Sequence, residues 1–162
     1  MPEYKNEIIE ILQDDARTTP AQIAEMLGIS EQEAAAAIKQ LEDDKVILKY
    51  SAAINKEKLD DYVFALIEVK VTPQREQGFE AIAERIYRYD EVMSMYLISG
   101  DYDFMVMVKE KSMKKVSQFV HEKLAVQEHV ISTSTHFVLK NYKENGVAFT
   151  IEDKDYRLVV AP

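Results

Sequence analysis

Cysteine is absent from the 162 residues of the chain. Without it the chain forms no disulfide, offers no thiolate to a metal and has no cysteine nucleophile. The first ten residues are rich in charge and contain no apolar core of the kind that a secretory signal needs. Because the apolar runs are also too short to span a bilayer, we expect a cytoplasmic protein without membrane segment, export signal or lipid anchor.

Residue groups that carry catalysis or bind metals are also missing. The histidines are His121, His129 and His136, and the last two lie seven residues apart on or near an expected strand. Side chains at an odd spacing on a strand point to opposite faces, so no metal cluster is predicted. No glycine-rich phosphate loop occurs, and nothing suggests a Ser-His-Asp arrangement. We therefore expect no enzyme and no cofactor.

A basic excess is lacking too, since the formal net charge is −9. Proteins that hold DNA through its phosphates usually carry a basic surface, so this charge argues against DNA binding. Residues 1–60 hold seven Lys and Arg against thirteen Asp and Glu, a net charge of −6. A composition of 47% hydrophobic and 30% charged residues is nevertheless typical of globular proteins and fits one or two small domains.

Helices are predicted through the first forty-four residues. The first covers about residues 4–15, and the second begins at Thr19, an N-cap that Gln22 completes as a capping box. Gly28 is the expected end of the second helix. Their apolar faces are predicted at Ile8, Ile9 and Leu12 in the first helix and at Ile23, Met26 and Leu27 in the second.

The third helix begins only two residues after the second ends. Ser30 caps it, Glu33 repeats the capping box, and the helix ends near residues 43–44. This is the spacing of a helix-turn-helix unit, whose second helix can enter the DNA major groove. A helical dimerisation or protein-binding domain stays the open alternative. The inward positions are expected to be Ala34, Ala37, Ile38 and Leu41.

A β-prone run over residues 46–55 follows and predicts a short strand pair, the wing. Residues 1–55 would then form a winged helix-turn-helix domain, with residues 56–61 as the hinge to the second half. The basic residues of this half concentrate around the run, at Lys45, Lys49, Lys56 and Lys58.

The second half has the element order β-α-β-β-α-β. That order predicts a ferredoxin-like domain over residues 62–140, an antiparallel sheet with both helices on one face. Because the other face needs a cover, we expect a homodimer through the sheets. The tail, residues 141–162, holds a possible extra strand over 156–160. The strands are expected over residues 62–71, 92–99, 103–108 and 129–139, and the helices over 77–89 and 113–124.

In order and spacing the two halves resemble the Lrp/AsnC family, the leucine-responsive and asparagine-responsive regulators. The resemblance rests on AEMLGIS at 24–30, IKQLEDDKVI at 38–47, NKEKL at 55–59 and SGDYD at 99–103. It implies an α+β protein in which a winged helix-turn-helix domain precedes a ferredoxin-like effector and oligomerisation domain. It also implies dimers that often assemble into octamers, and amino-acid effectors bound near Gly100, Asp101, Tyr102 and Asp103.

The chemistry of this glycine-aspartate turn fits such an effector. An aspartate can hold the ammonium of an amino acid, and backbone N–H groups exposed beside a glycine can hold its carboxylate. The turn also has a simpler interpretation, as a tight connection between two strands. Four alternating methionines on these strands, at positions 93, 95, 105 and 107, predict core or interface packing. The alternative is a hydrophobic ligand pocket beside the turn.

The third helix departs from the family, whose members usually carry arginines on its outward face. The matching positions are Ala35, Ala36 and Ala37, and the usual glycine at the helix end is Lys45. Arginine is the commonest direct reader of guanine, and this helix has none. The remaining candidates are Gln32 or Gln40 for adenine, Ala35 and Ala36 for thymine methyl groups, and Lys39, Lys45 and Lys49 for phosphates.

Together these observations predict a regulator that binds double-stranded DNA and responds to a small ligand, with weak and strongly salt-sensitive DNA binding per dimer. The alternative is a ligand-sensing or assembly protein of the same fold, in which DNA binding is weak or lost.

Overall fold

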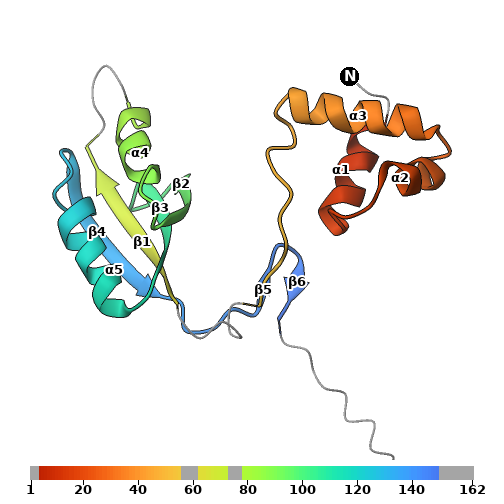
Figure 1. Cartoon of the computed structure of the whole chain (residues 1–162). Helices are drawn as coiled ribbons and strands as arrows, with labels where there is room; N and C mark the ends of the chain where they lie inside the picture. The colour runs from red at the N-terminus through yellow and green to blue at the C-terminus, as the bar shows by residue number, and fades with distance from the viewer. Residues whose placement is uncertain (1–3, 56–61, 73–77, 150–162) are drawn as a thin grey trace, which may run out of the picture. The chain divides into compact units, whose positions relative to one another are not determined.

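The computed structural model describes residues 4–55, 62–72 and 78–149. The chain divides into two compact units between Ile54 and Asn55 (Figure 1). Each unit has a hydrophobic core of its own, so each is described separately. Within the described residues, no helix is long and apolar enough to cross a membrane.

The first unit contains α1 (Lys5–Asp14), α2 (Pro20–Leu27) and α3 (Glu31–Asp43). Both predicted capping boxes are present, with Thr19 and Ser30 as the N-caps, and Gly28 ends α2 in the left-handed conformation at φ 67°. The buried side chains are Ile8, Leu12, Ile23, Ala24, Ala34 and Leu41.

One predicted core position in α2 is wrong. The side chain of Met26 is 64% exposed, and Ala24 is buried in its place. The buried face of α2 is centred between Ile23, Ala24 and Leu27, and at 100° per residue Met26 lies on the neighbouring face. Short helices leave the exact orientation of the apolar face open, because two turns contain too few positions to fix it.

The strand pair predicted over residues 46–55 is not formed, since residues 47–55 contain no strand. Ile47 packs against the core of the first unit, but Leu48 is 80% exposed. The run contains one β-prone stretch and no turn residue that would fold it back on itself. A strand needs a hydrogen-bonded neighbour, and this run does not supply a second strand to pair with the first.

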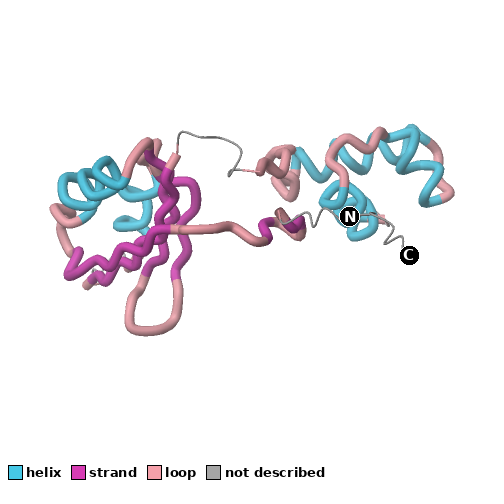
Figure 2. Tube along the Cα trace, turned by 90° about the horizontal axis from the view of Figure 1, so that it is seen from below, coloured by secondary structure: helices cyan, strands magenta, loops and turns pink. Residues whose placement is uncertain are grey.

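The second unit confirms the β-α-β-β-α-β order. Its strands β1 (Val63–Val71), β2 (Val92–Leu97), β3 (Phe104–Glu110) and β4 (Val130–Phe137) form an antiparallel sheet of order β2-β3-β1-β4. Helices α4 (Glu80–Tyr87) and α5 (Met113–Phe119) cover one face of this sheet (Figures 1 and 2). A π-helical turn, η2 (Val120–Leu124), continues α5 where a single regular helix was predicted.

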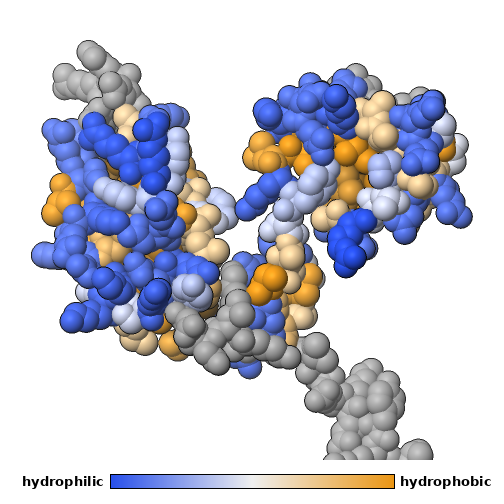
Figure 3. Space-filling view, viewed as in Figure 1, coloured by the Kyte–Doolittle hydropathy of each residue, from blue (hydrophilic) through white to orange (hydrophobic). Residues whose placement is uncertain are grey.

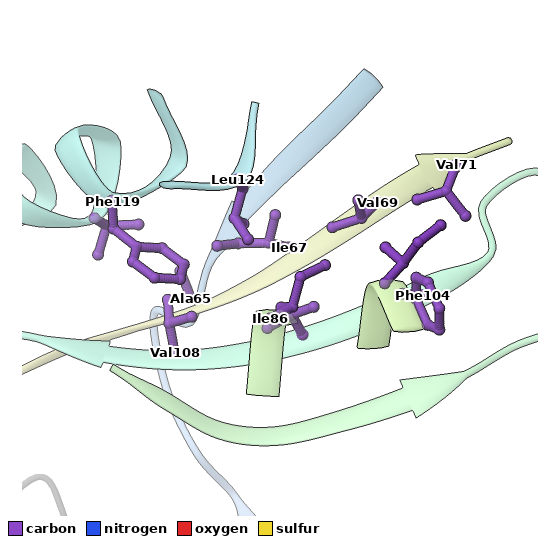
Figure 4. Packing of buried hydrophobic residues seen from close by; sticks show 12 residues of the cluster. Ala65, Ile67, Val69, Val71, Ile86, Phe104, Val108, Phe119 and Leu124 are labelled. Atoms are coloured by element: carbon purple, nitrogen blue, oxygen red, sulfur yellow. The ribbon is translucent and has the colours of Figure 1, made fainter. Parts of the chain in front are cut away.

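The core of this unit lies between the sheet and its two helices (Figure 4). Alternate residues of β1 point into it, as the strand period of two requires. Phe79 and Phe104 meet edge to face at 5.7 Å between ring centroids, which ties the start of α4 to β3. The outer surfaces of α4 and α5 are mostly hydrophilic (Figure 3). The strand residues in this core are Ala65, Ile67, Val69, Val71, Phe104, Val106 and Val108, and the helical ones are Ile82, Ile86, Val116, Phe119 and Leu124.

No helix of the described residues covers the other face of the sheet, which we call the open face (Figure 2). Leu66, at its centre, stands opposite Met107 on β3 and His136 on β4. His136 Nε2 lies 3.0 Å from Glu68 Oε2 on the neighbouring strand. The face is therefore apolar in its middle and polar toward β4. It includes Leu66, Glu68, Lys70, Met105, Met107, Ser134 and His136.

The tail contains a hairpin that was not predicted. Strands β5 (Lys143–Glu144) and β6 (Val147–Ala148) pair across a turn of Asn145 and Gly146, both with positive φ. The extra strand predicted over 156–160 lies outside the described residues.

Candidate DNA-binding surface and effector site

Five of the predicted DNA contacts lie on one face of α3, which we call the outward stripe: Gln32, Ala35, Ala36, Lys39 and Gln40. All five side chains are exposed. Their spacing of three, four, seven and eight residues places them on one face, opposite the buried Ala34 and Leu41. The face is available to a partner, and most of its side chains are small or uncharged.

Two acidic side chains beside the outward stripe are held by hydrogen bonds. Glu33 Oε2 accepts hydrogen bonds from the backbone N–H of Ser30, at 2.8 Å, and from its hydroxyl, at 2.7 Å. These bonds hold the pKa of Glu33 below its ordinary value. Glu42 accepts a 2.9 Å hydrogen bond from the hydroxyl of Tyr50. Burial, with Glu42 beside it, raises the pKa of the Tyr50 hydroxyl.

The other two candidates, Lys45 and Lys49, lie beyond the C-terminal end of α3, and both are exposed. Lys45 follows the C-cap Asp44 in the left-handed conformation at φ 59°. A cation here complements the partial negative charge of the helix end. The candidate phosphate contacts are therefore displaced along the chain from Gln32, Ala35 and Ala36 in the N-terminal half of the helix.

The candidate effector residues form the connection between β2 and β3, residues 98–103, which we call the 98–103 turn. Gly100 has φ 147°, a conformation that favours glycine, and apart from its two chain neighbours no described residue lies within 4 Å of where a Cβ would be. The N–H of Ile98 donates to the carbonyl of Asp103 at 2.8 Å, which closes the turn. The backbone at Gly100 is therefore open to an approaching molecule.

The two aspartates of this turn differ in their surroundings. Asp103 Oδ2 accepts a 2.8 Å hydrogen bond from the backbone N–H of Val71, and the Asp103 N–H donates to the carbonyl of Val69 at 3.1 Å. These bonds fix Asp103 to the end of β1. Asp101 is exposed. The turn therefore presents the Asp101 carboxylate to solvent, while the Asp103 carboxylate stabilises the connection.

The structure adds Lys70, which was not predicted, to this site. Lys70 is exposed near the end of β1, and its Nζ donates a 2.7 Å hydrogen bond to the backbone carbonyl of Asp101. The Lys70 ammonium thus reaches the backbone of the same residue whose exposed side chain gives the turn its carboxylate. Residues 70 and 101 are far apart in the sequence, and only the pairing of β1 with β3 brings them together.

A groove of about 320 Å³ lies between α4 and β2, and we call it the α4–β2 groove. Leu97 and Phe104, the residues on either side of the 98–103 turn, line one part of it. In the described part of the chain, no group of three His, Asp or Glu side chains is placed to hold a metal. The other lining residues are Phe79, Glu80, Ala83, Tyr87, Val92, Met93, Ser94 and Met95.

Two family models match the two units of the chain. A model described as the Lrp/AsnC ligand binding domain matches residues 64–148, and one described as winged helix-turn-helix DNA-binding matches residues 1–47. The chain belongs to the Lrp/AsnC family. The predicted family is therefore confirmed, together with the α+β fold class.

Relatives across the Lrp/AsnC family extend over nearly the whole chain. The HTH-type transcriptional regulator YugG of Bacillus subtilis is 47% identical over 100% of this chain and 99% of its own length. The regulator FL11 of Pyrococcus furiosus is 31% identical over 89% of this chain and 93% of its own. A solved transcriptional regulator of Neisseria meningitidis, in complex with L-Met, is 25% identical, with a TM-score of 0.72 and coverage of 89% and 93%.

These findings confirm the class of function predicted from the sequence. The chain is a transcriptional regulator of the Lrp/AsnC type with a ligand-binding domain. Its relatives are regulators of transcription, which are not enzymes.

Proposed function

We propose that this Lrp/AsnC regulator binds double-stranded DNA through α3 and responds to a free amino acid bound at the 98–103 turn. The observation that carries the effector proposal is the meeting of Lys70 and Asp101 at that turn. A free amino acid carries one ammonium and one carboxylate on the same carbon. A site for it needs one group of each charge, a short distance apart.

The turn supplies groups of both kinds. The exposed Asp101 carboxylate is suited to the effector's ammonium, and the Lys70 ammonium to its carboxylate. The open backbone at Gly100 lets the effector approach the peptide groups closely. Tyr102, half-buried between Asp101 and Asp103, is the remaining residue of the proposed effector site.

The α4–β2 groove favours an effector with an apolar side chain. It touches the turn through Leu97 and Phe104, and methionines 93 and 95 line it farther along β2. Methionine side chains are flexible and adapt to apolar groups of different shape. In the same proposal the sheets of two copies pair to form a homodimer, and dimers assemble further.

Calorimetric titration of the full chain with each of the twenty amino acids tests the effector proposal. Asp101→Asn removes the charge at nearly constant shape, so the affinity for the effector should fall at least tenfold while the oligomer stays intact. Asp90→Asn makes the same charge change at an exposed residue away from the turn and should leave the affinity unchanged. Equal affinities for both variants would exclude the 98–103 turn as the effector site.

The acidic first unit and the arginine-free α3 favour a second candidate, a ligand-sensing or assembly protein whose DNA binding is weak or lost. Fluorescence anisotropy with DNA from around the protein's own coding region, across a salt series, separates the two. Binding that weakens with salt supports the regulator that binds DNA. Effector binding without any DNA binding at low salt would leave the second candidate.

A further inference from the structure

The outward stripe of α3 has a chemistry suited to one kind of base pair. Ala35 and Ala36 present two methyl groups side by side in the middle of the helix, and Gln32 stands one turn before them. In the major groove, alanine contacts the methyl group of thymine, and glutamine pairs with the N6 and N7 atoms of adenine. Both contacts select A·T pairs.

The same surface has few side chains that can read guanine. Guanine is read mainly by arginine or lysine, which donate two hydrogen bonds to its O6 and N7. Lys39 is the one cation on α3, and it lies a full turn after Ala35. At most one position of the half-site can therefore be read as guanine by this helix, and the positions facing Ala35 and Ala36 cannot.

The small size of the two alanines also sets how closely α3 approaches the DNA. A long side chain at position 35 or 36 would hold the helix away from the base edges. Alanine lets the helix backbone come close enough for its methyl group to touch a thymine methyl. The N-terminal part of a recognition helix is the part that meets the bases, and both alanines lie in that half of α3.

From these three observations we infer that α3 reads A·T pairs through thymine methyl groups, with Ala35 and Ala36 as the residues that determine specificity. The inference rests on the proposed function, since it requires that the chain binds DNA. The target half-sites are A·T-rich at the two or more adjacent positions that face the alanines.

Selection of duplexes from a pool with a random central segment, using the full-length protein, should enrich such half-sites. Each thymine in the enriched sequence is then replaced in turn by uracil, which removes only the methyl group. We expect the affinity to fall about fourfold at the thymines that contact an alanine, the effect of losing one buried methyl. The other thymines should show no change.

Alanine-to-glycine variants test whether Ala35 and Ala36 cause the fall in affinity that follows replacement of thymine by uracil. In Ala35→Gly and Ala36→Gly, thymine and uracil should bind equally at the corresponding position, because the protein methyl is already gone. The comparison within one variant is independent of the stability that glycine removes from the helix. Ala125→Gly, at an exposed alanine of the second unit, should keep the full preference for thymine.

The outcomes separate this inference from the function on which it rests. Enrichment of G·C-rich half-sites, or equal binding of thymine and uracil at every position, would overturn the inference while DNA binding itself stands. Failure to bind any duplex at low salt would overturn the proposed DNA binding, and the inference with it.

Discussion

Two helix ends in the first unit require a residue in the left-handed conformation, and different residue types fill them. Gly28, with φ 67°, ends α2, and Lys45, with φ 59°, follows α3. The Lys45 N–H donates to the carbonyl of Glu42 at 3.1 Å, and the Val46 N–H donates to the carbonyl of Leu41 at 2.9 Å. This is the bond pattern of a Schellman motif, in which glycine is the usual residue at the position of Lys45.

Lys45→Gly should therefore stabilise the protein. The left-handed conformation costs a residue with a side chain about 1 kcal/mol, while the loss of a cation at the helix end costs about 0.3–1 kcal/mol at low salt. The net gain should be small at low salt and should approach about 1 kcal/mol at high salt, because salt screens the charge effect. Urea unfolding of the first unit, followed by circular dichroism, measures it.

Gly28→Ala is the matched control for this prediction, because it introduces a side chain at the other left-handed position. It should lower the unfolding free energy by about 1 kcal/mol at any salt concentration. A loss of stability in Lys45→Gly that does not shrink with salt would show that the lysine side chain contributes more than its charge.

At the scale of elements, features set by local chemistry could be predicted and features that need a distant partner could not. The capping boxes at Thr19 and Ser30 fixed the starts of α2 and α3, because cap and partner are three residues apart. The strand pair over residues 46–55 was wrong because a β-prone run does not specify the strand that pairs with it. The β5–β6 hairpin could have been found, since Asn145-Gly146 is a strong hairpin signal.

In the effector site, too, the local features could be predicted and the features that depend on distant residues could not. The 98–103 turn was predictable from glycine and aspartate between two β-prone runs. The contribution of Lys70 was not, because it depends on the register of β1 against β3. Nor did the sequence indicate that Asp103 would bind the backbone of Val71 and leave Asp101 as the exposed carboxylate.

A cluster of Tyr89, Glu91 and Lys123 joins the segment before β2 to η2. The stability that this cluster contributes depends on pH. Lys123 Nζ donates to Glu91 Oε1 and lies 5.0 Å from the centre of the Tyr89 ring. Burial alone would raise the pKa of Glu91, but the hydrogen bond and charge of Lys123 outweigh it and hold that pKa below its ordinary value. The bond to Glu91 raises the pKa of Lys123.

Stability from this pair should be lost in acid. Because the pKa of Glu91 is lower in the folded state, its contribution is present above the unfolded value near 4.5 and disappears as the pH falls through the folded value. Lys123→Met should therefore cost about 0.5–1 kcal/mol at pH 7 and almost nothing at pH values where Glu91 is protonated. Urea unfolding at both pH values measures the difference.

Lys114→Met provides the comparison, since it removes the same charge from an exposed position on α5. It should change stability little at either pH. Equal costs of Lys123→Met at neutral and acid pH would show that its alkyl chain, packed near Tyr89 and Phe119, carries the effect.

For the whole molecule, the surface that calls for a partner is the open face of the sheet. Leu66, Met105 and Met107 are half-buried in a single copy, with no helix of the described residues over them. A sheet face with an apolar middle is usually covered by another layer. A second copy of the same face is a self-complementary cover under two-fold symmetry, which is the basis of the proposed homodimer.

Leu66→Glu tests that proposal. Two-fold symmetry would bring two new carboxylates into one buried interface, where like charges without partners are strongly unfavourable, so the dimer should dissociate to folded monomers. The fold should survive, because the helices pack on the opposite side of β1, at Ala65 and Ile67. Sedimentation velocity at micromolar concentration measures the mass, and Met26→Glu, at an exposed apolar residue of α2, should leave it unchanged. A wild-type monomer, or a Leu66→Glu variant of unchanged mass, would place the subunit interface elsewhere on the molecule.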